Sequence, residues 1–481
     1  MPSDHILCAT VSAHVAVRLL AMAGDLSMGQ PTDQSARSAC LAGRLALLNG
    51  AGDEAAMHAR LVALLRWSGC TANAAGFAAL LGDDVAGRDA MLRHALPPGH
   101  PLSFSNVEPL ARIHCEVAGD VAGMLGLPAE VEAGLRHVWE HYDGGGAPQQ
   151  LRAPDIPALV YYTSLAGDLE ILARTHDAHT AVRMILGWGG AKYPAALAAL
   201  AAANVDGLLA ALDGPDEDGA LPAHQVALSI VADLVELKLP WLAGYSRRVA
   251  ELVGRAAALA GLPPLQQQTL ARAALVHGVG RASVPNTIWE RGGKPGRADW
   301  EKIRLAPYWT ARAGALVPEL RDEVALASHM YERLDGSGYF RGLEGDALGM
   351  PQRLLAAAGA YAALCAPRPW RAAMAPQQVA QLLEEEGRAG RFDAAAAGFV
   401  IAAAGGQAEA GLAPARKGLL SEREVEVLRR ISLGESNKEA ARVMQISPST
   451  VRTHMESIFR KLGCSTRAAA TLKGLTLGLI Q

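Results

Sequence analysis

The chain has 481 residues, of which 50% are hydrophobic, 19% are charged and 5% are aromatic. Its length predicts about three domains, and its apolar content excludes a chain that is disordered as a whole. Alanine and leucine, both strong helix formers, are abundant throughout. We therefore expect an all-α protein.

The charge is distributed unevenly along the sequence. The net charge is −3, but the residues from Ala415 to the end include 12 Lys and Arg against 6 Asp and Glu, which gives +6 for this tail and −9 for the rest. A basic tail on an acidic body predicts that the tail alone binds a polyanion.

Three further features favour a cytoplasmic protein. The first residues show no basic segment followed by an apolar core, so no secretory signal is expected. The apolar stretches Ala195–Leu212 and Ala394–Ala404 are too rich in alanine for membrane spans. The six cysteines form no CxxC pair, so we expect reduced thiols at Cys8, Cys40, Cys70, Cys115, Cys365 and Cys464.

An internal repeat organises the body of the chain. His137–Gly146 (HVWEHYDGGG) and His329–Gly338 (HMYERLDGSG) share five of ten residues at an offset of 192. Upstream, Leu65–Cys70 lies opposite Val276–Arg281 at an offset of 211. Two offsets in the same order indicate a duplication in which one copy changed length, although chance matching of Asp-Gly turns would also explain the short identity.

The spacing of apolar and turn-forming residues divides the chain into helical domains. Linkers are expected at 212–223 and 405–418, so the predicted domains are residues 1–211, 224–404 and 419–481. Within the second copy, Val249–Leu262, Leu270–Val279 and Pro376–Glu386 have helical periodicity.

The second copy contains several specific sequence motifs. They are Lys238-x-Pro240, Ser246-Arg247-Arg248-Val249, Asp335-Gly-Ser-Gly-Tyr339 and Arg368-Pro369-Trp370-Arg371. With these motifs, residues 231–404 resemble the HD-GYP family, and residues 6–210 resemble it more faintly. The resemblance implies helical bundles that hydrolyse cyclic di-GMP at a centre of two or three metal ions.

The positions at which that family holds its metal ions are changed here. A hydrolytic metal site requires imidazoles and carboxylates, and only His277 keeps an imidazole, or His277 and His329 if the alignment shifts by one residue. By resemblance, the family's site positions correspond to Tyr245, His277-Gly278, Arg281, Ala306, Met330-Tyr331 and Gly359 in the second copy, and to Gln34, Arg66-Trp67, Val138-Trp139 and Gly167 in the first. We therefore expect no metal, no cofactor and no catalytic residue, and hence no enzyme.

Two main interpretations of the altered centre remain open. The centre is either the packed core of a scaffold or a pocket for an apolar or aromatic small molecule. The pocket hypothesis assigns ligand binding to Tyr245, His277, Arg281, Ala306, Met330, Tyr331 and Gly359. Local hydrogen bonds would also account for His277 and His329, and residual activity is a third interpretation.

The basic tail has the sequence pattern of a helix-turn-helix. Ser421–Glu424 and Ser436–Glu439 are capping boxes that begin two helices, and the second helix ends at Met444. Ser447-Pro448 begins a third helix after a turn of only two residues. The third helix has an apolar stripe and a polar outer face, which suits the major groove of DNA or, alternatively, the solvated face of a helical bundle.

This tail closely resembles the LuxR-type helix-turn-helix family over residues 418–479. The matching motifs include Gly434-x-Ser436-Asn437-Lys438-Glu439, Thr450-Val451-Arg452-x-His454 and Lys461-Leu462-Gly463. The resemblance implies a four-helix domain that binds double-stranded DNA and forms a homodimer through its last helix, Thr466–Leu477. It also implies that Arg452, Thr453 and Glu456 face bases, and that phosphate or orienting contacts come from Lys438, Ser447, Ser449, Thr450, His454, Arg460 and Lys461.

Two function classes follow from the sequence. The favoured hypothesis is a DNA-binding transcription regulator whose catalytically inactive body senses a small molecule or mediates dimerisation. The alternative is a metal-dependent cyclic-dinucleotide phosphodiesterase with a DNA-binding tail. Stoichiometric metal in the purified protein would favour the alternative.

Overall fold

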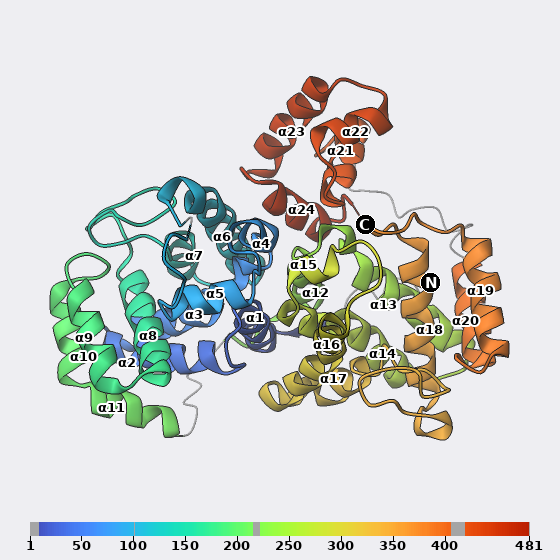
Figure 1. Ribbon diagram of the computed structural model, residues 1–481, viewed down its shortest axis with the longest axis horizontal. Helices are drawn as coiled ribbons and strands as arrows, with labels where there is room; N and C mark the ends of the chain where they lie inside the picture. Colours follow the sequence, from blue (N-terminus) through green and yellow to red (C-terminus); the bar gives the residue numbers. More distant parts are fainter. Residues whose placement is uncertain (1–8, 101, 215–221, 406–418, 481) are drawn as a thin grey trace. The chain divides into compact units, whose positions relative to one another are not determined.

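The computed structural model describes residues 9–100, 102–214, 222–405 and 419–480. These residues form 24 α-helices and two strands of three residues each, so the all-α prediction is confirmed (Figure 1). The strands β1 (Thr10–Ser12) and β2 (Gln225–Ala227) pair in a small sheet that the sequence pattern did not predict. The chain divides into an N-terminal unit, Ser12–Val226, and a C-terminal unit, Met1–Val11 with Ala227–Gln481.

The N-terminal unit contains the first eleven α-helices. They are α1 (Ala13–Ser27), α2 (Gln34–Leu48), α3 (Asp53–Leu65), α4 (Ala74–Leu81), α5 (Ala86–Leu92), α6 (Phe104–Met124), α7 (Ala129–Arg136), α8 (Ala158–Thr175), α9 (Ala178–Trp188), α10 (Ala195–Ala203) and α11 (Val205–Ala210). The short 3₁₀ helices are η1 (Ser68–Cys70) and η2 (Ala211–Asp213).

The body of the C-terminal unit contains nine described α-helices. They are α12 (Ser229–Glu236), α13 (Tyr245–Leu259), α14 (Pro264–Val276), α15 (Asn286–Trp289), α16 (Arg297–Leu316), α17 (Arg321–Ala327), α18 (Met350–Cys365), α19 (Pro376–Arg388) and α20 (Ala394–Gly405). Its 3₁₀ helices are η3 (Pro240–Leu242), η4 (Val279–Ser283), η5 (Pro318–Leu320) and η6 (Gly345–Ala347).

The four tail helices follow the predicted pattern. They are α21 (Glu422–Ser432), α22 (Asn437–Met444), α23 (Pro448–Leu462) and α24 (Arg467–Thr476). Ser421 and Ser436 form complete capping boxes, because each hydroxyl accepts from a backbone N–H three residues on and the Glu at that position accepts in return. Because each cap depends on residues only three positions apart, the sequence predicted the starts of both helices correctly.

Helix ends in the body depend on proline and glycine. Helix α13 begins after Gly244, whose φ of 72° is left-handed, and Gly261 at φ 71° follows its end. Helix α14 begins at Pro264 and so starts six residues before the predicted Leu270, because proline suits the first turn of a helix. Most of the two predicted linkers lies outside the described residues.

Equivalent contacts recur in both units at the offsets of the sequence repeat. The Ser35 N–H donates to the Asp25 carboxylate at 3.1 Å, and 211 residues later the Ser246 N–H donates to the Glu236 carboxylate at 2.7 Å. These contacts support a duplication of the helical bundle, whereas the exact domain boundaries remain a prediction.

The loops after the repeated His-x-x-Glu segments also match. The carboxylate of Glu140 accepts from the Gln149 N–H at 2.7 Å, and the carboxylate of Glu332 accepts from the Arg341 N–H at 2.8 Å. Gly336 has a φ of 74°, as the predicted tight turn requires. The two loops therefore keep the same geometry, although they share only part of their sequence.

One membrane-related observation concerns the apolar helices. Among the residues that the structure describes, no single helix is both long and apolar enough to span a membrane. Helix α10 and the segment Val205–Asp213 pass such a test together, but they are bent by 69° at the break between them.

Candidate functional sites

Helix α23 is the central element of the candidate nucleic-acid interface. Its apolar stripe is buried, with exposed fractions of 0% for Val451, 4% for Met455 and 0% for Ile458. The Ser447 hydroxyl accepts from the Thr450 N–H at 3.0 Å, and the helix ends at Leu462, just before the left-handed Gly463. Because this stripe is buried, the opposite face of α23 points toward solvent.

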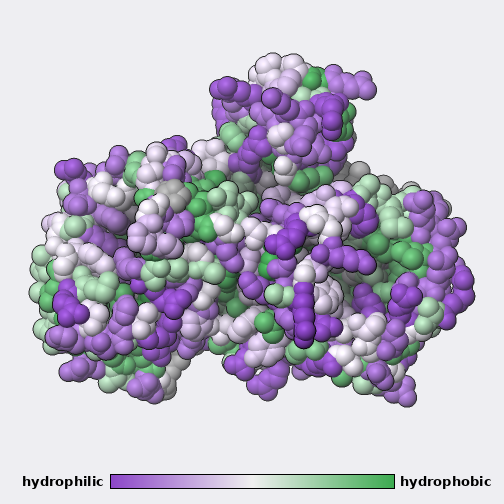
Figure 2. Space-filling model, in the orientation of Figure 1, coloured by the Kyte–Doolittle hydropathy of each residue, from purple (hydrophilic) through white to green (hydrophobic). Residues whose placement is uncertain are grey.

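That outer face presents the polar side chains that the sequence selected. His454 is half-buried, and the other nine predicted DNA-binding residues are exposed: Lys438, Ser447, Ser449, Thr450, Arg452, Thr453, Glu456, Arg460 and Lys461. The visible surface of the tail helices is largely hydrophilic (Figure 2). The structure thus gathers these residues on α22, α23 and the turn between them.

Two of the expected base-contacting residues pair with each other. The Arg452 guanidinium donates to the Glu456 carboxylate at 2.9 Å, one helical turn away. Both side chains are more than half exposed, at 76% and 60%. Such a pair contributes little stability in water, so either partner can exchange it for a DNA group at small cost.

Lys461 is held differently from the other basic residues of α23. Its ammonium donates to Glu424 of α21 at 2.6 Å, and the Ser457 hydroxyl donates to the same carboxylate at 2.7 Å. Burial alone would raise the pKa of Glu424, but hydrogen bonds from Lys461, Ser421 and Ser457 lower it to about 2. Lys461 therefore joins two helices, a role that its sequence position did not reveal.

The altered centre of the C-terminal unit is a contiguous cluster of buried side chains. The Tyr245 hydroxyl donates to the Gly359 carbonyl at 3.0 Å, which links α13 to α18. The Arg281 guanidinium donates to the Tyr331 hydroxyl at 3.0 Å and to His277 Nε2 at 3.0 Å. The exposed fractions of Tyr245, His277 and Arg281 are 3%, 2% and 7%. These predicted ligand-binding residues are thus paired with one another.

The remaining positions of this centre are closely packed. A Cβ added to Gly359 would lie 2.3 Å from the Met330 sulfur, so this glycine makes room for the methionine. Ala306 packs on Val284 and Ile288, and a Cβ on Gly280 would lie 1.9 Å from the Ala306 carbonyl oxygen. These contacts favour the packed-core interpretation over the pocket interpretation for the seven predicted positions.

A cavity of about 570 Å³ does exist in the C-terminal unit, but other residues form it. It lies among α13, α18, α19 and α20, and its lining includes Arg248, Tyr361 and Cys365. None of the seven predicted ligand-binding positions is among its lining residues.

The donor set of the altered centre does not fit a metal pair. His277 Nδ1 lies 2.6 Å from the Ala274 carbonyl and therefore donates to it, and Nε2 accepts from Arg281, which has no acceptor. Both ring nitrogens are thus used, and burial followed by the Arg281 charge lowers the pKa of His277 well below its ordinary value. Across the part of the chain that the structure describes, no group of three or more His, Cys, Asp and Glu could hold a metal ion.

His329 makes a local hydrogen bond within its own segment. Its Nδ1 lies 2.8 Å from the Ala325 carbonyl, one turn earlier. A local hydrogen bond therefore accounts for His329, as one of the sequence interpretations proposed.

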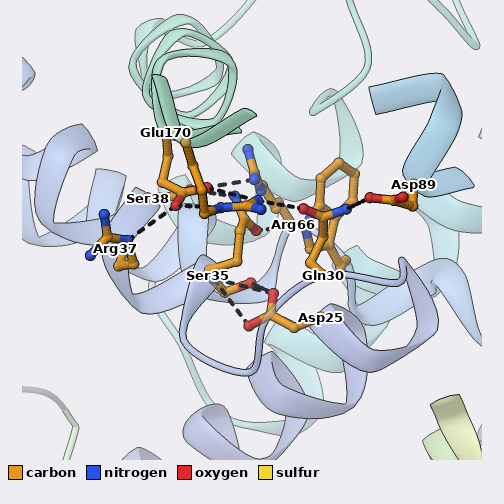
Figure 3. A network of polar contacts seen from close by, with 11 residues as sticks. Asp25, Gln30, Ser35, Arg37, Ser38, Arg66, Asp89 and Glu170 are labelled. Carbon is orange, nitrogen blue, oxygen red and sulfur yellow. Dashed lines mark hydrogen bonds and ion pairs between the residues drawn. The ribbon is translucent and has the colours of Figure 1, made fainter. Parts of the chain in front are cut away.

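Several of the equivalent positions of the N-terminal unit also meet in space, and Figure 3 shows Arg66 beside Ser38 in the surrounding polar network. The Trp67 indole donates to Gln34 at 3.3 Å, and Gln34 donates to the Ser38 hydroxyl at 2.8 Å. Arg66 donates to the same hydroxyl at 3.4 Å, and a Cβ on Gly167 would lie 1.4 Å from Arg66 Nη1. The first-copy residues that were aligned with the altered centre of the second copy therefore lie close together in the N-terminal unit.

Comparisons with known families place two parts of the chain. Residues 229–396 match the family described as "HD domain", and residues 418–473 match "Bacterial regulatory proteins, luxR family". The chain carries an HD domain and a LuxR-type helix-turn-helix domain. Within the tail, the chain is 43% identical over 63 residues to the probable transcriptional regulatory protein NarL of Mycobacterium tuberculosis, which covers 13% of this chain and 29% of NarL.

The HD domain has relatives among cyclic-dinucleotide enzymes. The chain is 27% identical over 294 residues to 3'3'-cGAMP-specific phosphodiesterase 3 of Vibrio cholerae, which covers 57% of this chain and 64% of the relative. It is 32% identical over 164 residues to phosphodiesterase 1 of the same organism, which covers 34% of this chain and 38% of that relative. The chain therefore spans less than two thirds of the length of either curated relative.

A solved structure shares the fold of the helical body. It is the crystal structure of a cyclic GMP-AMP specific phosphodiesterase of V. cholerae, with a TM-score of 0.58 and 21% identity over 82% of this chain and 98% of that one. The expectation that the chain is not an enzyme is wrong in the light of the curated relatives, because the HD domain is related to phosphodiesterases and this relation points to an enzymatic function. The expectation had rested on the missing metal ligands alone.

Proposed function

We propose that this protein is a DNA-binding transcription regulator whose HD domain takes a cyclic dinucleotide of the 3'3'-cGAMP class and thereby changes DNA binding. The exposed polar face of α23 is the observation on which the regulatory part rests. The relation of residues 229–396 to cGAMP-specific phosphodiesterases supports the ligand class. Location in the cytoplasm and assembly as a homodimer through α24 are part of the same proposal.

DNA binding is assigned to residues according to their surroundings. The side chains of Arg452, Thr453 and Glu456 project from the exposed face of α23 and contact base edges in the major groove. The hydroxyls of Ser449 and Thr450 stand at the start of α23, where the helix dipole favours a phosphate. Lys438, Ser447, His454, Arg460 and Lys461 provide further backbone or orienting contacts.

The test of the DNA-binding part uses the full chain and a randomised duplex library. Arg452→Ala should cost about 1–3 kcal/mol and relax the sequence preference. Lys438→Ala is the matched control, because it removes an exposed positive charge from α22 and should weaken all sequences equally. An even loss across the library in both variants would show that α23 does not contact the bases.

The test of the ligand part measures DNA affinity with and without 3'3'-cGAMP. A ligand shifts the DNA-binding equilibrium only if its affinity differs between the free and DNA-bound forms. We expect a change of about 5-fold or more in DNA affinity at saturating ligand. Unchanged affinity at saturation, together with no detectable cGAMP binding by calorimetry, would overturn the ligand part and leave the DNA-binding part intact.

The curated relatives favour a second function, hydrolysis of a cyclic dinucleotide by the same HD domain. The residues at its altered centre do not fit a metal pair, so no step is assigned to a metal here. Incubation of the full chain with 3'3'-cGAMP and chromatography of linear products measures this function directly. Turnover that is lost in His277→Ala would assign the reaction to the altered centre, whereas turnover that survives would place it elsewhere in the chain.

A further inference from the structure

The N-terminal unit contains a cavity that neither the HD match nor the proposed function uses. Its volume is about 470 Å³, within the range of small-molecule sites. The walls come from α4, α5, α6 and α8 and from the segments that follow α3, α5, α7 and α9. The residues at the positions of the altered centre, Arg66, Trp67, Val138 and Trp139, are among its lining residues. The space that the C-terminal unit fills with its own side chains is therefore partly open in the N-terminal unit.

Four aromatic side chains line this cavity. They are Trp67, Phe77, Phe104 and Trp139. Phe77 and Trp139 pack edge to face at 6.3 Å, and Phe104 is 45% exposed, although it is a large apolar residue. Aromatic walls favour a flat ring system, because rings gain from stacked and edge-to-face contacts beyond simple burial.

The wall also contains a buried cation without a direct counter-ion. Arg66 is 5% exposed; in the described structure its guanidinium donates one long hydrogen bond, to Ser38 at 3.4 Å, and lies over the Trp67 ring at 4.3 Å. The carboxylates of Asp25, Asp168 and Glu170 act on Arg66 only at longer range, and burial lowers its pKa. A buried guanidinium in this state is stabilised by an acceptor or an anion that comes close to it.

The other polar groups of the wall distinguish between ligand classes. Lys192 is already neutralised, because its ammonium lies 2.7 Å from Asp168. The Thr163 hydroxyl is buried and has no hydrogen-bond partner in the described structure. One unpaired cation matches one negative charge, whereas a cyclic dinucleotide would bring two phosphates beside the Asp168 carboxylate.

From these observations we infer that the cavity of the N-terminal unit binds a small planar aromatic molecule with a single acidic group, which pairs with Arg66. This site is distinct from the HD domain at residues 229–396, and the inference does not depend on the proposed function. Its ligand would act on the N-terminal unit and not on the altered centre of the C-terminal unit.

Two fluorescent probes test this inference on the full chain. The first is 8-anilino-1-naphthalenesulfonate, and the second is N-phenyl-1-naphthylamine, which has the same rings without the acidic group. Arg66→Met should weaken the sulfonate probe by about 10- to 100-fold, because a charge-assisted hydrogen bond is lost. The same variant should leave the affinity for the neutral probe nearly unchanged. Equal effects on both probes would overturn the acidic-group assignment.

A second pair of variants tests the cavity itself and does not depend on Arg66. Ser164 lines the cavity and is half-buried on α8, so Ser164→Trp should fill the space and abolish binding of both probes. Leu186→Trp is the matched control, because Leu186 is 47% exposed and is not a lining residue. Circular dichroism reports whether each variant is folded. Probe binding that persists in folded Ser164→Trp would overturn the site, and so would displacement of the sulfonate probe by 3'3'-cGAMP.

Discussion

The two repeated units place corresponding residues at their centres, but they use the space differently. In the C-terminal unit, Met330 fills the gap beside Gly359, and Arg281 is held between His277 and Tyr331. In the N-terminal unit the residue that corresponds to Met330 is the smaller Val138, which lines a cavity of about 470 Å³. The corresponding positions of the two units therefore have two different outcomes in one chain.

The charged residue at each centre reflects the same difference. Nε and Nη2 of Arg281 donate to neutral partners, the Tyr331 hydroxyl and His277 Nε2, whereas Nη1 has no hydrogen-bond partner in the described structure. In the described structure Arg66 has one long hydrogen bond, to Ser38, and a contact with the Trp67 ring, although both guanidinium groups are buried. A buried cation with so few hydrogen-bond acceptors is costly, so the N-terminal centre is the one that gains more from a bound acidic group.

The largest expected effect comes from a bulky residue placed in the packed centre. Ala306 is 3% exposed and contacts Val284 and Ile288, so Ala306→Trp should destabilise the protein by more than about 4 kcal/mol or prevent folding. Ser164→Trp, beside the cavity of the N-terminal unit, should change the stability by less than about 1 kcal/mol. Thermal unfolding of both variants measures the difference. Similar losses in the two variants would contradict the contrast between a filled and an open centre.

Local signals explain how much of the fold could be predicted from the sequence. The helix starts at Ser421 and Ser436 depend on residues three positions apart, and the buried stripe of α23 depends on spacing within one helix. Both were therefore visible in the sequence. The repeat was visible as well, because the turn glycines and the Asp-Gly loops keep the same positions in both copies.

The candidate sites were harder to predict because they depend on distant pairs. The Tyr245–Gly359 hydrogen bond joins residues 114 positions apart, and Arg281 and Tyr331 are 50 apart. The family resemblance could select the seven positions, but it could not show that their side chains satisfy one another. The cavity of the N-terminal unit draws its walls from several helices and loops, and no local motif reports how much space such walls leave.

A smaller effect is expected from two equivalent buried carboxyl groups, and it should appear in both units. Burial raises the pKa of Asp25 from 3.8 to about 7 and the pKa of Glu236 from 4.5 to about 7. The folded protein thus keeps protons that the unfolded chain releases, so the free energy of unfolding falls as the pH rises from about 4 to about 7. Relative to Asp25→Asn or Glu236→Gln, the wild type should lose about 3 kcal/mol over this range.

Thermal unfolding between pH 4 and pH 8 measures this linkage. The control is Asp177→Asn, because hydrogen bonds from Thr180 lower the pKa of Asp177. For such a group the stabilisation is present at neutral pH and is lost as the pH falls, which is the opposite sign. A difference between wild type and Asp25→Asn that does not depend on pH would show that Asp25 is ionised in the folded protein. A slope for Glu236→Gln alone would show that the two units differ at this contact.

The smallest expected effect isolates the hydroxyl that holds Arg281. The Tyr331 hydroxyl accepts two hydrogen bonds from this guanidinium, so Tyr331→Phe leaves buried donors unpaired and should cost about 1–2 kcal/mol. Tyr339→Phe is the matched control, because Tyr339 stacks on Tyr331 at 4.9 Å and has no hydrogen bond through its own hydroxyl in the described structure. The control should be nearly neutral in chemical denaturation.

In the background of Arg281→Met, the cost of Tyr331→Phe should disappear, because the donors are gone. A cost that persists in that background would mean that ring packing, and not the hydrogen bond to Arg281, stabilises the packed centre.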